Sequence, residues 1–268
     1  MQLEGAVVIV TGASAGIGRE TALAFARRGS HLSLAARRED RLHDLSRRID
    51  RIGVQTLVVP TDVGRAADVE RMVRATVERF GRIDVLVNNA GFGFSGTIEE
   101  TTEADMRELM DVNYMGAFNA TRAVLPHMRR QRQGHIVNVA SVVGKLAFPF
   151  HGAYSATKFA MIGMTESLRG ELDGSGVTAT VVLPGSTRTE FFDVQRTNDG
   201  HVSAPTGPQQ NAEHVARAIV RSVDHPVPEV NVFPGYRIAY GLNAFFPSLR
   251  DFAGRQFYRR SKGKPRRP

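Results

Sequence analysis

Cysteine is absent from the 268-residue sequence, which excludes a disulfide framework, a thiolate nucleophile and a cysteine-ligated metal site. No segment reaches the ~18 apolar residues that a membrane-spanning helix needs. The apolar run near the N-terminus, Ala6–Val10, is short and no basic region precedes it, so we predict no signal peptide. These absences favour a cytoplasmic protein, and we predict no metal site.

Acidic residues are absent from the last fourteen positions, RQFYRRSKGKPRRP, which carry seven of the eight net positive charges of the chain. The basic character is therefore mostly a property of this tail. It is weak evidence that the folded body binds nucleic acid, and we predict no nucleic-acid partner.

Short apolar runs rich in β-branched residues alternate with longer helical patterns. The runs are residues 6–10, 31–35, 54–59, 83–88, 135–140, 177–183 and 229–233, and the helical patterns cover about 17–28, 39–51, 66–80, 103–131, 153–173 and 211–223. Near-continuous apolar runs are typical of strands that are buried on both faces of a parallel sheet. The order predicts an α/β fold: a single Rossmann-type, doubly wound parallel sheet of about seven strands with helices on both faces.

We predict that the chain divides into a Rossmann domain, residues 1–235, and a C-terminal appendage, residues 236–268. Apolar residues of the appendage recur every three or four positions and Pro247 interrupts them, so we predict two amphipathic helices that serve as a lid, an interface or a membrane contact. Residues 186–210 show no clear periodicity, and we predict a binding loop or lid there.

The segment TGASAGIG follows the first predicted strand and opens the first helix. Glycines allow a tight turn in which backbone N–H groups approach a pyrophosphate at the positive end of the helix. We predict that the cofactor contacts Gly12, Ser14, Ala15, Gly16, Ile17 and Gly18. A purely structural glycine turn is the alternative.

The second predicted strand is followed by Arg37 and Arg38, where sites that select NAD often carry an acid. An arginine here can form a charge-assisted, bidentate contact with a 2′-phosphate, and we predict that Arg37 selects NADP(H) in this way. We therefore favour NADP (NADPH) as the cofactor. The alternative is a solvated arginine pair on a surface turn.

Tyr154 and Lys158 are four residues apart, on one face of a predicted helix. A cation beside a phenol stabilises the phenolate and lowers the pKa of the tyrosine, which could then act as an acid near neutral pH. Taken alone, the pair is better explained as two unrelated surface side chains, and the rest of the chain has to decide.

The chain resembles the short-chain dehydrogenase/reductase family. The resemblance rests on seven motifs in order: TGASAGIG, Asp62 in TDV, NNAG at 88–91, Asn113 in DVNYMGAF, Ser141 in VNVASVVG, YSATK at 154–158, and PGSTRT at 184–189. Each motif alone is moderately specific, whereas their joint order along the β-α alternation is very specific.

The resemblance implies a role for each matching residue. Tyr154 would be the catalytic acid or base, Lys158 would lower its pKa and bind the nicotinamide ribose, and Ser141 would hold the substrate oxygen. Asn113 would hold a water of the proton relay. Contacts with the cofactor would come from Asp62, Val63, Asn89, Ala90, Gly91, Tyr154, Lys158, Pro184, Gly185, Thr187 and Thr189.

The implied reaction is hydride transfer between NADP(H) and a carbonyl or secondary alcohol. A second hypothesis is an NADP-binding redox sensor or regulatory partner without turnover. Six apolar residues suggest an apolar small-molecule substrate: Phe92, Phe94, Leu146, Phe148, Phe191 and Phe192. The family commonly forms homodimers or homotetramers through the helices near 105–130 and 153–173, and here these carry Met110, Tyr114, Phe118, Phe159, Met161 and Leu168.

Overall fold

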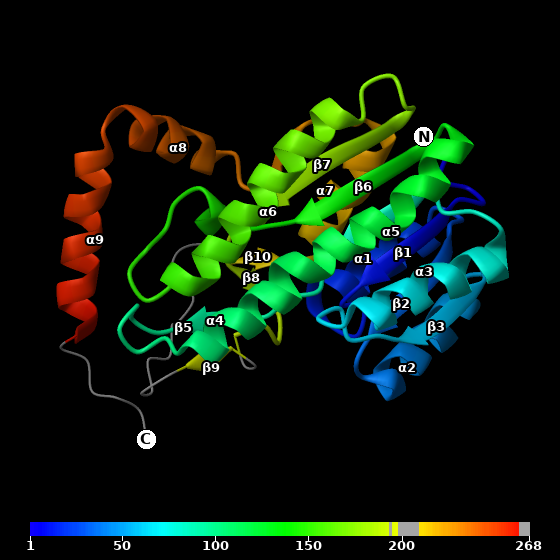
Figure 1. Cartoon of the computed structure of the whole chain (residues 1–268), viewed down its shortest axis with the longest axis horizontal. Helices are drawn as coiled ribbons and strands as arrows, with labels where there is room; N and C mark the ends of the chain where they lie inside the picture. Colours follow the sequence, from blue (N-terminus) through cyan, green and yellow to red (C-terminus); the bar gives the residue numbers. More distant parts are fainter. Residues whose placement is uncertain (193–194, 198–208, 263–268) are drawn as a thin grey trace.

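The computed structural model describes residues 1–192, 195–197 and 209–262. Its centre is a seven-stranded sheet in which each described pairing is parallel, with the strand order β11-β7-β6-β4-β1-β2-β3 (Figure 1). The strands are β1 (Val7–Thr11), β2 (His31–Ala36), β3 (Thr56–Pro60), β4 (Val85–Asn88), β6 (Gly134–Val139), β7 (Val177–Leu183) and β11 (Glu229–Asn231). The predicted doubly wound sheet of seven strands is confirmed.

Helices cover both faces of the sheet, and each face has its own apolar core (Figure 1). One core joins the sheet to α1 (Gly16–Ala26), α2 (Glu39–Asp50) and α7 (Ala212–Asp224). The other joins it to α3 (Ala66–Phe80), α5 (Gly116–Gln131) and α6 (Gly152–Glu171). Alternate strand residues supply the two cores: Val8 and Val10 of β1 face the first, and Ile9 faces the second.

The helix predicted over 103–131 is divided into three parts. The α-helix α4 (Glu103–Met110) leads into a π-helical turn over Asp111–Met115, and α5 follows directly. A capping box at Thr102, whose hydroxyl accepts from the Asp105 N–H, fixes the start of α4. The π-helical turn contains Asn113, and such turns frequently occur at functional sites.

Short strands lie beyond the carboxyl edge of the main sheet. They are β5 (Phe94–Ser95), which pairs with β9 (Arg196–Thr197), and β8 (Thr187–Arg188), which pairs with β10 (Gln210–Asn211). The predicted loop over 186–210 falls partly outside the described residues, so its role as a lid stays a prediction.

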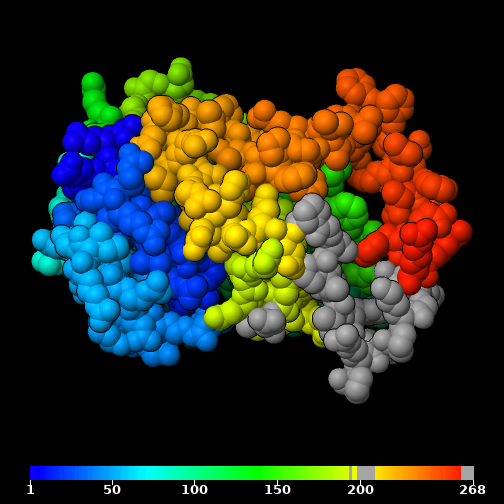
Figure 2. Space-filling model, turned by 180° about the vertical axis from the view of Figure 1, so that it is seen from behind, coloured from blue at the N-terminus to red at the C-terminus, as the bar shows by residue number. Residues whose placement is uncertain are grey.

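The C-terminal segment forms two helices, α8 (Gly235–Phe245) and α9 (Pro247–Lys262), that extend from one end of the molecule (Figures 1 and 2). The predicted break at Pro247 is confirmed. Phe257 and Tyr258 of α9 contact Phe150 of the body, at ring-centroid distances of 6.4 and 5.3 Å. The last basic residues of the tail, Lys264 to Arg267, lie outside the described residues.

Candidate active site

A cavity of about 770 Å³ lies beyond the carboxyl ends of the central strands. The strand order reverses beside β1, which has β2 on one side and β4 on the other, and open α/β sheets bind ligands at such a point. The cavity brings together most of the predicted site residues: Gly12, Ser14, Ala15, Gly16, Ile17, Arg37, Arg38, Asp62, Val63, Asn89, Ala90, Gly91, Ser141, Tyr154, Lys158, Pro184, Gly185, Thr187 and Thr189. Two predicted residues, Gly18 and Asn113, are not part of its lining.

The glycine turn after β1 packs against the segment after β4. Gly12 has a φ of +67°, and a Cβ there would lie 2.8 Å from Asn89 Nδ2. Asn89 Nδ2 in turn donates to Thr11 O at 2.9 Å, and the Asn89 and Ala90 N–H groups donate to Thr11 Oγ1. The close approach requires glycine and leaves the start of α1 facing the cavity, which suits a bound pyrophosphate.

Gly18 has a packing role and does not line the cavity, so its predicted contact with the cofactor stays a prediction. It is buried in the first turns of α1, where a Cβ would lie 2.3 Å from Gly12 O. The residue therefore acts on the cavity by letting α1 approach the turn.

Arg38 is the better placed of the two arginines after β2. Its Nε and Nη2 donate to Ser14 Oγ at 3.2 and 3.1 Å, so its guanidinium lies beside the glycine turn. Arg37 is exposed and also lines the cavity. The carboxylate of Glu190, from the segment after β8, lies 3.2 Å from Arg38 Nη1.

Ser141, Tyr154 and Lys158 meet where β6 and α6 approach each other. Ser141 follows β6 with extended backbone and begins a short 3₁₀ helix, Val142–Gly144. A Cβ on Gly144 would lie 3.0 Å from Lys158 O, so this glycine permits the 3₁₀ helix to lie against α6. The Ser141 hydroxyl lies near enough to the Tyr154 side chain to lower the pKa of the phenol.

Lys158 is held one turn from Tyr154 on the same face of α6. Its Nζ donates to Val139 O at 3.0 Å and lies 5.7 Å from the centroid of the Tyr154 ring. Burial lowers the pKa of Lys158 to about 8, so the ammonium form still predominates at neutral pH.

The pKa of Tyr154 is shifted in the direction opposite to the one expected from the sequence. Burial raises this pKa well above its ordinary value, and the hydrogen bond with Ser141 only partly offsets the rise. The phenol is therefore protonated at neutral pH. A protonated phenol can donate a proton, and the nearby ammonium and hydroxyl can stabilise negative charge as it develops.

Asn113 supports the site from behind the cavity. Its Oδ1 accepts from the Phe92 N–H at 2.9 Å, and its Nδ2 donates to Phe92 O at 3.0 Å and to Thr157 Oγ1 at 3.3 Å. The buried amide therefore fixes the segment after β4 against α6. The implied contact with a relay water stays a prediction.

Aromatic side chains form the remaining wall of the cavity. Of the six apolar residues expected there, Phe92, Phe94, Phe148, Phe191 and Phe192 line it, whereas Leu146 does not. The Phe191 ring lies 5.8 Å from the Tyr154 ring. Tyr236 of α8 and Phe257 of α9 also line the cavity. A lid over the cavity was one of the roles predicted for the C-terminal appendage.

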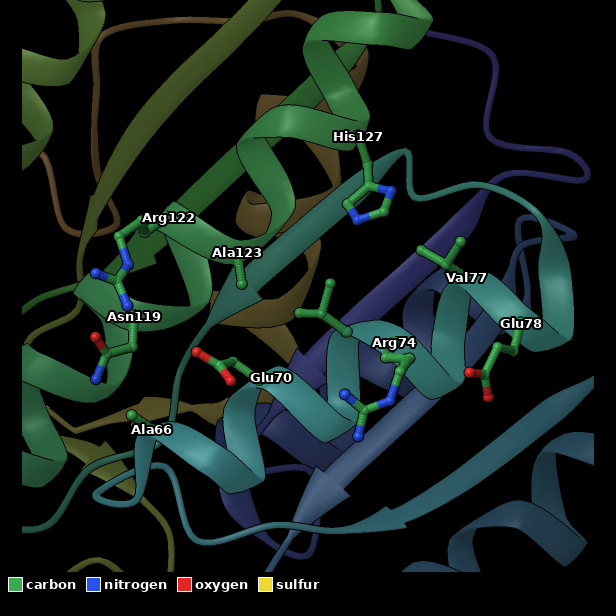
Figure 3. Close-up of a pocket in the computed structure, with 10 residues that line it drawn as sticks. Ala66, Glu70, Arg74, Val77, Glu78, Asn119, Arg122, Ala123 and His127 are labelled. Carbon is green, nitrogen blue, oxygen red and sulfur yellow. The ribbon is translucent and has the colours of Figure 1, made fainter.

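A second hollow, of about 410 Å³, lies between α3 and α5 (Figure 3). Figure 3 shows Glu70 and Arg74 on one wall and Arg122 and His127 on the other. It shares no lining residue with the cavity around Tyr154, and we assign no function to it.

Comparisons with known proteins agree with this geometry. Residues 6–200 match the family profile described as short chain dehydrogenase. Dehydrogenase/reductase SDR family member 7B of Xenopus laevis is 36% identical over 231 residues, which cover 82% of this chain and 72% of that protein. 11-beta-hydroxysteroid dehydrogenase A of Sesamum indicum is 36% identical over 272 aligned positions, which cover 97% and 78% of the two chains.

Two solved structures show the same fold. A short chain dehydrogenase/reductase from Burkholderia phymatum in complex with NAD has a TM-score of 0.85 and 28% identity, with 93% of this chain and 96% of that chain covered. An alcohol dehydrogenase from Thermococcus sibiricus complexed with 5-hydroxy-NADP has a TM-score of 0.76 and 30% identity, with 85% and 96% covered.

The fold and the cavity define a nucleotide-binding oxidoreductase of the Rossmann type. The chain belongs to the short-chain dehydrogenase/reductase family. Members of this family use NAD or NADP on small-molecule substrates. None of the helices in the described part of the chain is long and apolar enough to cross a membrane.

Proposed function

We propose that the protein transfers a hydride between NADP(H) and a carbonyl or secondary alcohol of an apolar substrate. The observation that carries the proposal is that Tyr154, Ser141 and Lys158 face the same cavity as the glycine turn and Arg38. The aromatic wall supports a lipid-like, steroid-like or aromatic substrate, because such walls bury apolar ligands.

When bound, the cofactor would supply the hydride for carbonyl reduction or accept it in the reverse reaction. Tyr154 donates its hydroxyl proton to the carbonyl oxygen, where negative charge develops. Ser141, a donor and an acceptor, orients that oxygen. The Lys158 ammonium stabilises the phenolate that remains on Tyr154. Asn113 is a positioning residue, because it holds the Phe92 backbone.

The preference for NADP(H) rests on charge at the adenosine end of the cavity. The cavity fits a dinucleotide: it extends from the arginines after β2, past the glycine turn, to Tyr154. The Arg38 guanidinium beside Ser14 offers a charge-assisted contact to a 2′-phosphate. Asp62 and Val63 lie at the same end and would contact the adenine.

A panel of carbonyl compounds tests the proposed function directly. NADPH and NADH oxidation is followed with steroid, aromatic and aliphatic ketones, and binding of both cofactors is measured by fluorescence. Turnover of apolar ketones with NADPH is expected. Tight binding without turnover of any compound would favour the redox sensor, and failure to bind either dinucleotide would contradict both hypotheses.

We also propose that the protein is a homo-oligomer that pairs through α5 and α6. Phe118 of α5 and Phe159 of α6 are 37% and 45% exposed, and Tyr114 stacks on Phe118. Met161 and Leu168, which were expected to add to this surface, are buried in the protomer, so the apolar face is smaller than predicted. Sedimentation at micromolar concentration tests the pairing, and a species of about 29 kDa alone would contradict it.

The outer face of α8 and α9 is proposed as a contact with an anionic membrane. Phe245, Phe246 and Phe252 are 81%, 59% and 54% exposed, and several arginines of the two helices accompany them. Buried apolar area together with attraction to anionic lipid is sufficient for interfacial binding. The inner side of α9 meanwhile closes the cavity through Phe257.

Vesicle co-sedimentation distinguishes this contact from a purely structural role of the helices. The protein is expected to sediment with anionic vesicles at low salt, and a Phe245→Asp, Phe252→Asp variant should stay in solution. Ile98→Asp, which changes an apolar side chain that is 73% exposed on the body, is the matched control. If the parent protein stays in solution with anionic vesicles at low salt, the proposed membrane contact is contradicted.

A further inference from the structure

One carboxylate joins three segments at the adenosine end of the cavity. Glu190 Oε2 accepts from Arg41 Nη1 at 2.6 Å and from Arg38 Nη1 at 3.2 Å. Arg38 also donates to Ser14 Oγ from its Nε and Nη2. The glycine turn, the start of α2 and the segment after β8 are therefore linked through Glu190. Neither Arg41 nor Glu190 belongs to a motif that the sequence analysis identified.

Glu190 is ionised in this arrangement. The hydrogen bond from Arg41 lowers the pKa of its carboxyl group more than burial raises it, and the hydrogen bond from Arg38 lowers the pKa further. The three side chains are each about 40% exposed: 41% for Arg38, 40% for Arg41 and 43% for Glu190. Solvent therefore screens the ion pairs, and a competing anion can reach the two guanidinium groups.

We propose that Glu190 sets how strongly the site discriminates between NADP(H) and NAD(H), because its carboxylate competes with the 2′-phosphate for Arg38 and Arg41. The inference rests on the proposed cofactor site. A phosphate dianion that takes the Arg38 guanidinium must displace Glu190 or bind beside a like charge, and either weakens NADPH binding. NADH carries a hydroxyl at this position and does not compete with the carboxylate.

Glu190 also lies next in sequence to a residue at the substrate end of the cavity. The next residue, Phe191, contacts the Tyr154 ring, and its N–H donates to Thr189 Oγ1 at 3.2 Å. Glu190 therefore lies on a segment that borders both ends of the cavity. The acid that many NAD sites carry directly after the second strand is absent here, and Glu190 brings a carboxylate to the same arginines from a segment remote in the sequence.

The test compares Glu190→Gln with the parent in equilibrium binding. Dissociation constants are measured by calorimetry for NADPH, NADH, 2′,5′-ADP and 5′-AMP. We expect NADPH and 2′,5′-ADP to bind roughly twofold to fivefold more tightly to the variant, the range that an exposed ion pair supports. NADH and 5′-AMP should bind equally or more weakly. Raising the ionic strength should reduce the difference between parent and variant.

Asp44→Asn is the matched control, because Asp44 lies on α2 together with Arg41, pairs with Arg47 and is not part of the cavity lining. It removes the same charge and should leave the ratio of the NADH and NADPH dissociation constants unchanged. An unchanged or lower ratio in Glu190→Gln overturns the inference while the proposed function stands. A parent that does not distinguish 2′,5′-ADP from 5′-AMP contradicts the proposed NADP preference itself.

Discussion

Replacing Gly18 by alanine tests the packing that shapes the glycine turn. The added Cβ would lie 2.3 Å from Gly12 O and 2.5 Å from Asn89 Nδ2. Neither neighbour can move freely, because Gly12 is in the left-handed region and Asn89 is hydrogen-bonded to Thr11. Overpacking of this kind costs about 1–3 kcal/mol of unfolding free energy. That loss matches or exceeds the ~1 kcal/mol that alanine gains over glycine within a helix.

The assay is thermal unfolding together with equilibrium binding of the dinucleotide. For a chain of this size the net loss corresponds to a melting temperature that is lower by a few degrees. Dinucleotide affinity should fall as well, because the turn must shift to accommodate the Cβ. Gly170→Ala in α6, where a Cβ meets nothing within 4 Å, is the control and should be neutral or slightly stabilising. If Gly18→Ala melts at or above the parent temperature and binds equally well, the packing argument is wrong.

Three further predictions concern the catalytic, cofactor and core residues. Tyr154→Phe should retain NADPH binding and lose about 10²–10⁴-fold in turnover of the best ketone, and a parental rate would contradict the proton-donor role. Arg37→Ala and Arg38→Ala should each weaken NADPH binding about tenfold to a hundredfold and leave NADH binding nearly unchanged. A parent protein that binds NADH as tightly as NADPH, or more tightly, would refute the NADP preference. Burial lowers the pKa of His135 to about 4, so the unfolded chain binds more protons between pH 4 and its ordinary value of 6.5. The contribution of His135 to the unfolding free energy is therefore fully present above about pH 6.5, and the unfolding free energy falls by about 2 kcal/mol on going from pH 7 to pH 5. Urea unfolding at the two pH values should show a smaller fall for His135→Asn, and equal falls in both proteins would exclude this histidine as the cause.

The sequence by itself determined the fold class and most of the residues that line the cavity. Strand and helix patterns have strong periodicities, and every strand of the main sheet was found within a few residues of its predicted position. The carboxyl ends of parallel strands lie at one edge, so motifs that follow them had to converge there. For that reason the glycine turn and Ser141, which follow strands, had to lie at one edge, whereas Tyr154 and Lys158 were placed beside them by the resemblance to the family.

The tertiary structure decided the properties that depend on burial and on contacts remote in the sequence. The pKa of Tyr154 is raised because desolvation outweighs the effect of nearby groups, and spacing alone cannot give the degree of burial. Gly18 and Asn113 act from behind the cavity because their neighbours, Gly12 and Phe92, come from other segments. Glu190 reaches Arg38 across 152 positions of sequence, a separation over which no local pattern carries information.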